Sequence, residues 1–94
     1  MATYLMFGKY SIDVLGKISA SRTKNAAALI KKNGGEIKSG YALLGDKDLV
    51  LVVEFPGLQN AMKASVALAK QLGIAFTTTP AVSIENFDKL IAGK

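Results

Sequence analysis

This 94-residue sequence carries hydroxyl and carboxylate side chains that could do chemistry, but it contains neither histidine nor cysteine. Histidine is the commonest general base near neutral pH and the usual nitrogen ligand of metals. Cysteine supplies disulfides, thiolate metal ligands and thiol nucleophiles. A serine–histidine triad, an ordinary structural zinc site and a histidine-ligated haem are therefore excluded.

Two aspartates one residue apart, Asp46 and Asp48, follow Gly45 in a short polar segment. Their oxygens suit Mg²⁺ or Ca²⁺, but the further ligands of a recognisable metal loop are missing. Aspartate in a hairpin accepts hydrogen bonds from backbone N–H groups, and glycine adopts backbone angles closed to other residues. We therefore interpret Gly45 and Asp48 as the signature of a structural turn, and we expect no metal site.

Three hydroxyl-bearing residues in strand-like segments are the candidates for a ligand site: Ser39, Tyr41 and Thr77. Such groups orient small molecules in pockets between a sheet and its helices. Threonine and tyrosine also favour strands for packing reasons alone, which is the competing interpretation. If the protein is an enzyme, Tyr41 as hydrogen-bond donor and Asp48 as base are its candidate catalytic residues. No cofactor is expected.

Hydrophobic periodicity predicts the elements that position these residues. Strands are expected over residues 3–10, 37–44, 49–55 and 74–79. A helix is expected to begin at Ser21 or Thr23 and to stop at Asn33-Gly34-Gly35. A second helix covers residues 58–72 and is closed by Gly73, and Ser83 caps a short last helix.

This order of elements predicts an α+β fold, a single ferredoxin-like β-α-β-β-α-β sandwich over residues 1–94 with an antiparallel sheet. Right-handed crossovers place both main helices on one face of that sheet. The run Leu49–Val53 is apolar at every position, so it supplies buried-type side chains to both faces. Either the last helix or a second subunit must cover the other face, and we expect a homodimer.

Strict alternation along the second strand would place Ile37, Ser39, Tyr41 and Leu43 on one face. Lys38 would then lie on the opposite face, where it could pair with Glu54 across the hairpin. An exposed ion pair of this kind contributes about 0–1 kcal/mol, so it indicates nothing about function.

The net charge of +5 is concentrated in residues 9–38, which hold seven basic and two acidic side chains. We interpret this segment as solvated helix surface. Nucleic-acid binding is disfavoured, because RNA-binding sheets of this topology carry aromatic residues on the third strand, where this chain has Leu49–Val53. No secretory signal and no apolar run of about 20 residues is present, so we expect a cytoplasmic protein and no membrane contact.

The segments 33–41, 43–48, 50–54 and 77–79 resemble the GYD domain proteins, small prokaryotic proteins named for a Gly-Tyr-Asp signature. Gly45 and Asp48 stand at the glycine and aspartate positions, whereas Lys47 stands in place of the tyrosine. No role of that tyrosine therefore carries over. The resemblance spans most of the chain and implies a dimeric α/β barrel, in which two ferredoxin-like sheets face each other. Distant relatives of that architecture include small monooxygenases, isomerases, haem enzymes and ligand-sensing domains, among which the fold alone does not choose.

The function expected from the sequence is that of a small binding or accessory domain that holds a small, largely apolar molecule. The alternative is a cofactor-independent monooxygenase or isomerase acting on a small aromatic or apolar substrate. Such chemistry relies on the reactivity of the substrate, so it needs few catalytic residues. The sequence leaves open which of the two applies.

Overall fold

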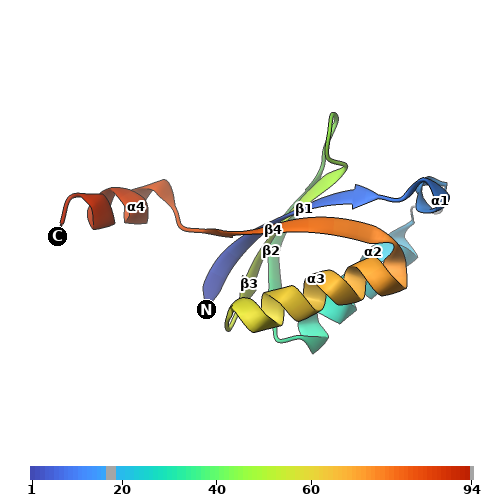
Figure 1. The fold of residues 1–94 in the computed structure, drawn as a ribbon, viewed down its shortest axis with the longest axis horizontal. Coiled ribbons are helices and arrows are strands. Elements are labelled where there is room, and N and C mark those ends of the chain that lie inside the picture. Colours follow the sequence, from blue (N-terminus) through green and yellow to red (C-terminus); the bar gives the residue numbers. More distant parts are fainter. Residues whose placement is uncertain (17–18, 94) are drawn as a thin grey trace.

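The computed structural model describes residues 1–16 and 19–93, and in it an antiparallel sheet carries two long helices on one face (Figure 1). The elements are β1 (Ala2–Tyr10), α1 (Ile12–Leu15), α2 (Ala20–Lys32), β2 (Glu36–Ala42), β3 (Leu49–Phe55), α3 (Leu58–Leu72), β4 (Ile74–Ala81) and α4 (Ile84–Ile91). The strand order is β2-β3-β1-β4, and each pair is antiparallel. The predicted α+β, ferredoxin-like arrangement is confirmed.

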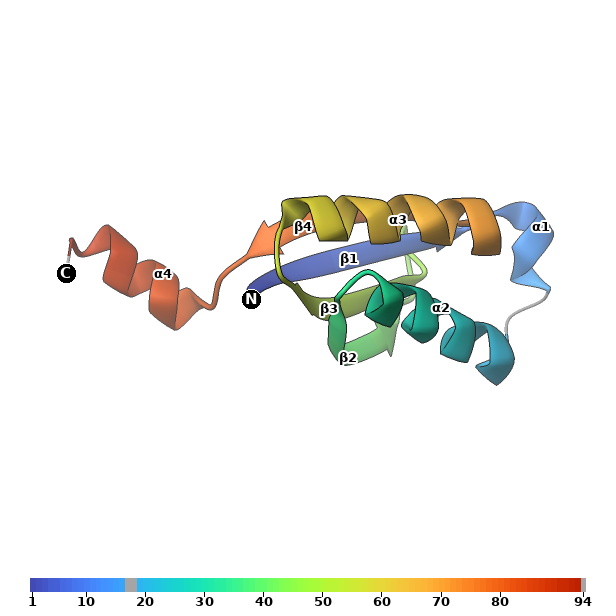
Figure 2. The same cartoon turned by 90° about the horizontal axis from the view of Figure 1, so that it is seen from below.

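Helices α2 and α3 lie side by side across the same face of the sheet, as Figure 2 shows from the helix side. The core between them and the sheet contains five side chains that are fully buried: Met6, Ile30, Val53, Phe55 and Leu68. Leu49 and Leu51 of β3 also pack against this core. The odd-numbered residues of β3 therefore face the helices, and Val50 and Val52 face the other way.

The boundaries of the two long helices follow from their caps. Ser19, rather than Ser21 or Thr23, is the N-cap of α2, and its hydroxyl accepts a hydrogen bond from the Arg22 backbone N–H at 3.3 Å. The predicted start was wrong because several hydroxyl residues in this segment suit an N-cap equally well. Gly73, at a φ of 69°, closes α3 as predicted.

The predicted face pattern of β2 was wrong. Ile37 pairs with Val53, but Ser39 pairs with Val52, so a β-bulge lies between Ile37 and Ser39. The extra residue, Lys38, reverses the alternation. Ile37 therefore packs against the core, while Ser39 and Tyr41 lie on the face turned away from the helices. The strand also ends at Ala42 rather than Leu44, so the connection to β3 is a loop over residues 43–48.

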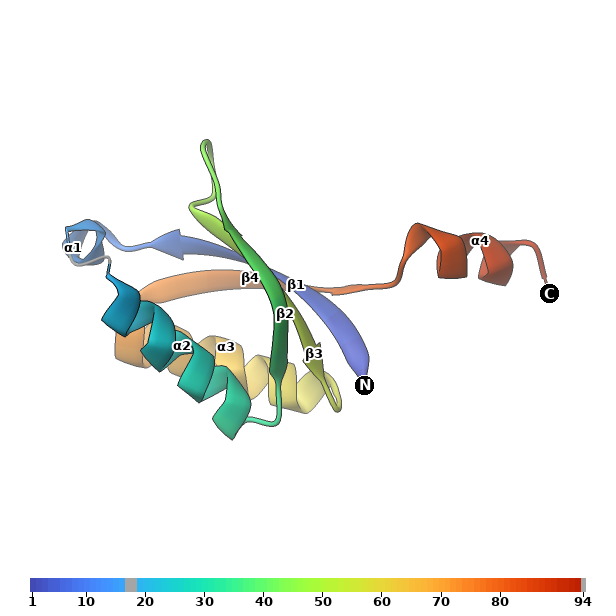
Figure 3. The same cartoon turned by 180° about the vertical axis from the view of Figure 1, so that it is seen from behind.

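The last helix, α4, projects beyond the sheet and covers none of it (Figures 1 and 3). Ser83 caps it as predicted, accepting a hydrogen bond from the Asn86 backbone N–H at 3.1 Å. None of its residues is buried. The C-terminal helix of the same chain is therefore not the cover for the second face of the sheet. Among the described residues, no helix combines the length and apolar character needed to cross a membrane.

Candidate functional site

The face of the sheet turned away from α2 and α3, here called the open face, has an apolar centre. Leu5 lies opposite Val52 and Phe7 lies opposite Val50, on the two central strands. All four side chains are partly exposed. Apolar surface of this kind in the middle of a sheet is usually covered by another element or subunit.

Hydroxyl groups on the two edge strands border this apolar centre. On β2, Ser39 lies opposite Val52, and Tyr41 lies opposite Val50. On β4, Thr77 lies opposite Phe7. All three ligand candidates from the sequence therefore lie on the open face, Ser39 and Tyr41 on one edge of the sheet and Thr77 on the other. An apolar centre with a polar rim is the usual layout of a protein interface.

A cleft lies on the other side of the sheet, between the N-terminal part of α2 and the ends of the central strands. Its enclosed part has a volume of about 60 Å³. Its apolar lining consists of Ala26, Ile37, Leu49, Leu51, Ile74 and Phe76. Its polar lining consists of Tyr10, Ser19, Arg22 and Thr23. Gly8 helps to shape the floor, because an added Cβ would lie 2.6 Å from Phe76 and 2.7 Å from Leu49.

Arg22 is the unusual group in this cleft. One of its terminal nitrogens donates to the Leu72 carbonyl at the end of α3, where a cation is favoured by the helix dipole. Its Nε is buried and, in the part of the chain that the structure describes, has no hydrogen-bond partner. Within the described residues, no carboxylate forms an ion pair with Arg22. A buried donor without an acceptor is rare in folded proteins and needs an explanation.

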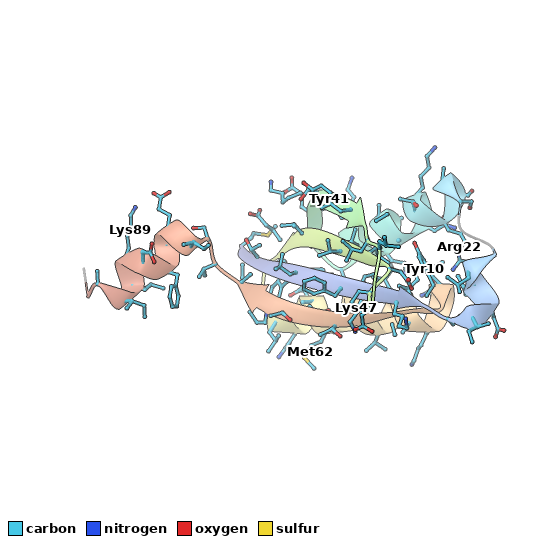
Figure 4. All side chains as sticks on the ribbon, turned by 90° about the horizontal axis from the view of Figure 1, so that it is seen from above. Tyr10, Arg22, Tyr41, Lys47, Met62 and Lys89 are labelled. Carbon is cyan, nitrogen blue, oxygen red and sulfur yellow. The ribbon has the colours of Figure 1, made fainter. Side chains whose placement is uncertain are left out.

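The enclosed part of the cleft is continuous with a wider mouth, because both are lined by Tyr10, Thr23, Ile37, Leu49 and Leu51. Tyr41 and Asp48 line only the wider mouth. Tyr41 is 63% exposed and belongs by register to the open face, so it stands at the edge between the two surfaces. Figure 4 labels Tyr10 and Arg22 at one end of the sheet and Tyr41 on its edge strand.

The hairpin loop holds its aspartates in structural contacts. Asp48 Oδ2 accepts a hydrogen bond from the Tyr10 backbone N–H at 2.8 Å, and the Asp46 carbonyl accepts one from Lys9 Nζ at 3.1 Å. Gly45 has a φ of 134°, as expected for the glycine of a turn. In the part of the chain that the structure describes, no three acidic side chains gather as metal ligands.

Sequence analysis missed Arg22, Tyr10 and Thr23 as cleft residues. They come from two segments that meet only in the folded chain, and neither carries a motif. One signal was present, since Arg22 is the single arginine beside eleven lysines. Its planar guanidinium is better suited than lysine to a buried contact.

The chain matches a family model in sequence and a solved structure in fold. A family model described as GYD domain matches residues 4–91. Among solved structures, the crystal structure of the Mycobacterium tuberculosis leucine response regulatory protein (LrpA) is similar, with a TM-score of 0.57 and 12% identity. The match covers 87% of this chain and 51% of the regulator, so the chain spans about half of that protein. At this identity the likeness shows the fold alone. No curated protein matches the chain.

Proposed function

The chain belongs to the GYD domain family, and we propose that it is a small-ligand-binding domain that acts as a homodimer. The observation that carries the ligand proposal is the buried Nε of Arg22, which has no hydrogen-bond partner among the described residues and lies in a largely apolar cleft. A ligand that fits is small and largely apolar, and it presents one acceptor oxygen to this donor. A carboxylate suits the site best, because it would also neutralise the guanidinium charge.

The dimensions of the cleft limit how such a ligand lies. The enclosed part, at about 60 Å³, takes only a small group. The rest of the molecule would occupy the wider mouth, where Thr23, Tyr41 and Asp48 provide polar contacts. The apolar walls favour an aromatic or branched aliphatic body.

Thermal-shift and calorimetric titration with a panel of small acids tests this proposal. The panel contains aromatic and branched aliphatic carboxylates, each paired with its neutral amide and with the parent hydrocarbon alcohol. We expect the acids to bind and to raise the melting temperature, because they bind the folded state alone. If none of the acids binds, or if the alcohols bind as tightly as the acids, the proposal fails.

The homodimer is supported by the open face of the sheet. No element of the described chain covers its apolar centre, since α4 points away from it (Figure 3). The hairpin loop rises on the same side, and its tip residue Leu44 is fully exposed at 105%. Burying a valine or leucine completely contributes about 1.5–3 kcal/mol, so several such residues per subunit offset much of the about 4–15 kcal/mol lost on association.

An enzymatic alternative is kept because Tyr41 and Asp48 line the same mouth. In this proposal the domain is a cofactor-independent monooxygenase or isomerase, with Tyr41 as hydrogen-bond donor and Asp48 as base. Oxygen uptake or isomer formation with small aromatic substrates would favour it. Unchanged turnover in the double variant Tyr41→Phe, Asp48→Asn would remove these two assignments.

A further inference from the structure

The helix α4 and the residues that lead to it form an exposed apolar surface in the described chain. Five large side chains of this C-terminal arm are between 52% and 79% exposed: Val82, Ile84, Phe87, Leu90 and Ile91. On most soluble proteins, exposed apolar residues are scattered singly over the surface. Five of them within ten consecutive residues therefore indicate a contact that a single copy does not make.

The helix is amphipathic, with its apolar residues gathered on one side. At 100° per residue, Ile84, Phe87, Leu90 and Ile91 fall within a single stripe along the axis. The opposite side carries Glu85 and Lys89, which form an ion pair at 3.5 Å. A helix of eight residues is too short to be stable by itself in water, so packing of the apolar stripe would be needed to hold it.

The described residues of the same chain bury none of the side chains of α4. Only Val82 and Ser83 connect the end of β4 to α4, and the Ser83 hydroxyl is engaged as the N-cap. Ser83 has the extended backbone angles φ −64° and ψ 153°, which continue the direction of the strand. Figures 1 and 3 show the result, an arm that leaves the sheet along β4 and does not turn back over it.

We propose that α4 is an exchanged arm, whose apolar stripe packs on a second copy of this chain. This inference rests on the proposed homodimer and goes beyond it, because the arm of each copy would cover exposed apolar surface of the other. The second copy offers matching surface on the side that it would turn towards the arm, in the apolar centre of its open face and in its exposed Leu44.

The surface area that the two arms could bury agrees with the proposal of an exchanged arm. Covering the exposed surface of five such side chains removes on the order of 50–100 Å² each, or about 250–500 Å² per arm. Two-fold symmetry repeats the contact, and the receiving surfaces bury a similar amount, which gives about 1,000–2,000 Å² in total. A standard stable interface buries about 1,200–2,000 Å². The arms would therefore contribute a large share of the interface.

The test compares two full-length single variants that add the same charge to adjacent positions of α4. Phe87→Glu places it on the apolar stripe. Asn86→Glu is the matched control, because glutamate at the third helical position completes a capping box with Ser83. Sedimentation velocity over a dilution series gives the dimer dissociation constant, and circular dichroism of each variant checks that the sheet and its two long helices stay folded.

We expect Phe87→Glu to weaken the dimer about tenfold or more, as for the loss of a buried aromatic contact, and Asn86→Glu to leave it unchanged. An unchanged dimer in Phe87→Glu would overturn the exchanged arm while leaving the homodimer intact. A tighter dimer would overturn it too, because the apolar stripe of α4 would then oppose association rather than support it. A full-length chain that is monomeric at every concentration would remove both proposals.

Discussion

The Asp48 carboxylate accepts a hydrogen bond from the backbone N–H of Tyr10, with 2.8 Å between Oδ2 and N. The ladder between β1 and β3 ends at the pair Gly8 and Leu49, so this carboxylate takes the place of the next strand carbonyl. The backbone N–H of Asp48 also donates to the Gly8 carbonyl at 2.8 Å. The signature aspartate thus fastens the hairpin loop to the neighbouring strand, rather than only stabilising its own turn.

Replacing this aspartate tests whether its role is structural. Asp48→Ala removes the acceptor and leaves the part-buried Tyr10 N–H unpaired, so we expect a loss of about 1–3 kcal/mol in the free energy of unfolding. Asp48→Asn keeps an oxygen acceptor and should lose less. Urea denaturation of both variants measures the difference. Unchanged stability together with a collapse of ligand affinity would instead assign Asp48 to function.

Neighbouring residues of β3 should respond differently to the same substitution. Val50→Lys places a charge on the open face, so we expect a folded monomer with a lower free energy of unfolding. Leu51→Lys places it against the core, so we expect the subunit to unfold. Light scattering and circular dichroism distinguish the two results. If the Val50→Lys protein is still a dimer at the affinity of the parent, the open face is not the interface.

Binding of small acids should depend on Arg22 specifically. We expect Arg22→Gln to weaken binding of the acids about tenfold or more, in line with loss of a charge-assisted hydrogen bond, while their neutral amides are affected less. Lys24→Gln is the control, because it removes the same charge from an exposed position two residues along α2. Equal losses in both variants would indicate a general effect of net charge, and calorimetric titration at two salt concentrations would reveal it.

Two glycines that border only open space allow a test of backbone strain in the signature turn. An added Cβ meets nothing within 4 Å at Gly45 or at Gly16, but Gly45 has a φ of 134° and Gly16 has a φ of −79°. We therefore expect Gly45→Ala to lower the free energy of unfolding by about 1–3 kcal/mol. Gly16→Ala should leave it unchanged or raise it slightly. Thermal denaturation of the pair measures the contrast, and equal stabilities would show that the loop relaxes without strain.

Local patterns were sufficient to predict most of the fold. The stripe containing Ala26 and Ile30, the glycine that closes α3 and the Ser83 cap depend on residues within one or two turns of each other, and all are confirmed. The pair between Lys38 and Glu54 is also confirmed, at 3.8 Å. It forms although the alternation used to predict it was wrong, because the long lysine side chain reaches across from the bulge.

The candidate site was less predictable, because it depends on contacts between distant segments. Tyr10 and Arg22 line the same cleft only when β1, α2 and the end of α3 are packed together. No sequence pattern within any of these segments predicts which other segment it contacts. The bulge could not be predicted either, since one extra residue in a strand does not change its amino-acid composition in a recognisable way. Self-association stays a prediction, as do the roles of Ser39, Tyr41 and Thr77.

The bulge at Lys38 determines which face of the sheet Tyr41 occupies. Deleting this one residue would restore plain alternation from Ile37 onward. Ser39 would still lie opposite Val52 and Tyr41 opposite Val50, so both would stay on the open face. A regular strand that kept all of its residues would instead place Tyr41 opposite Leu49, on the side of the cleft, so it is the bulge that keeps this tyrosine on the open face.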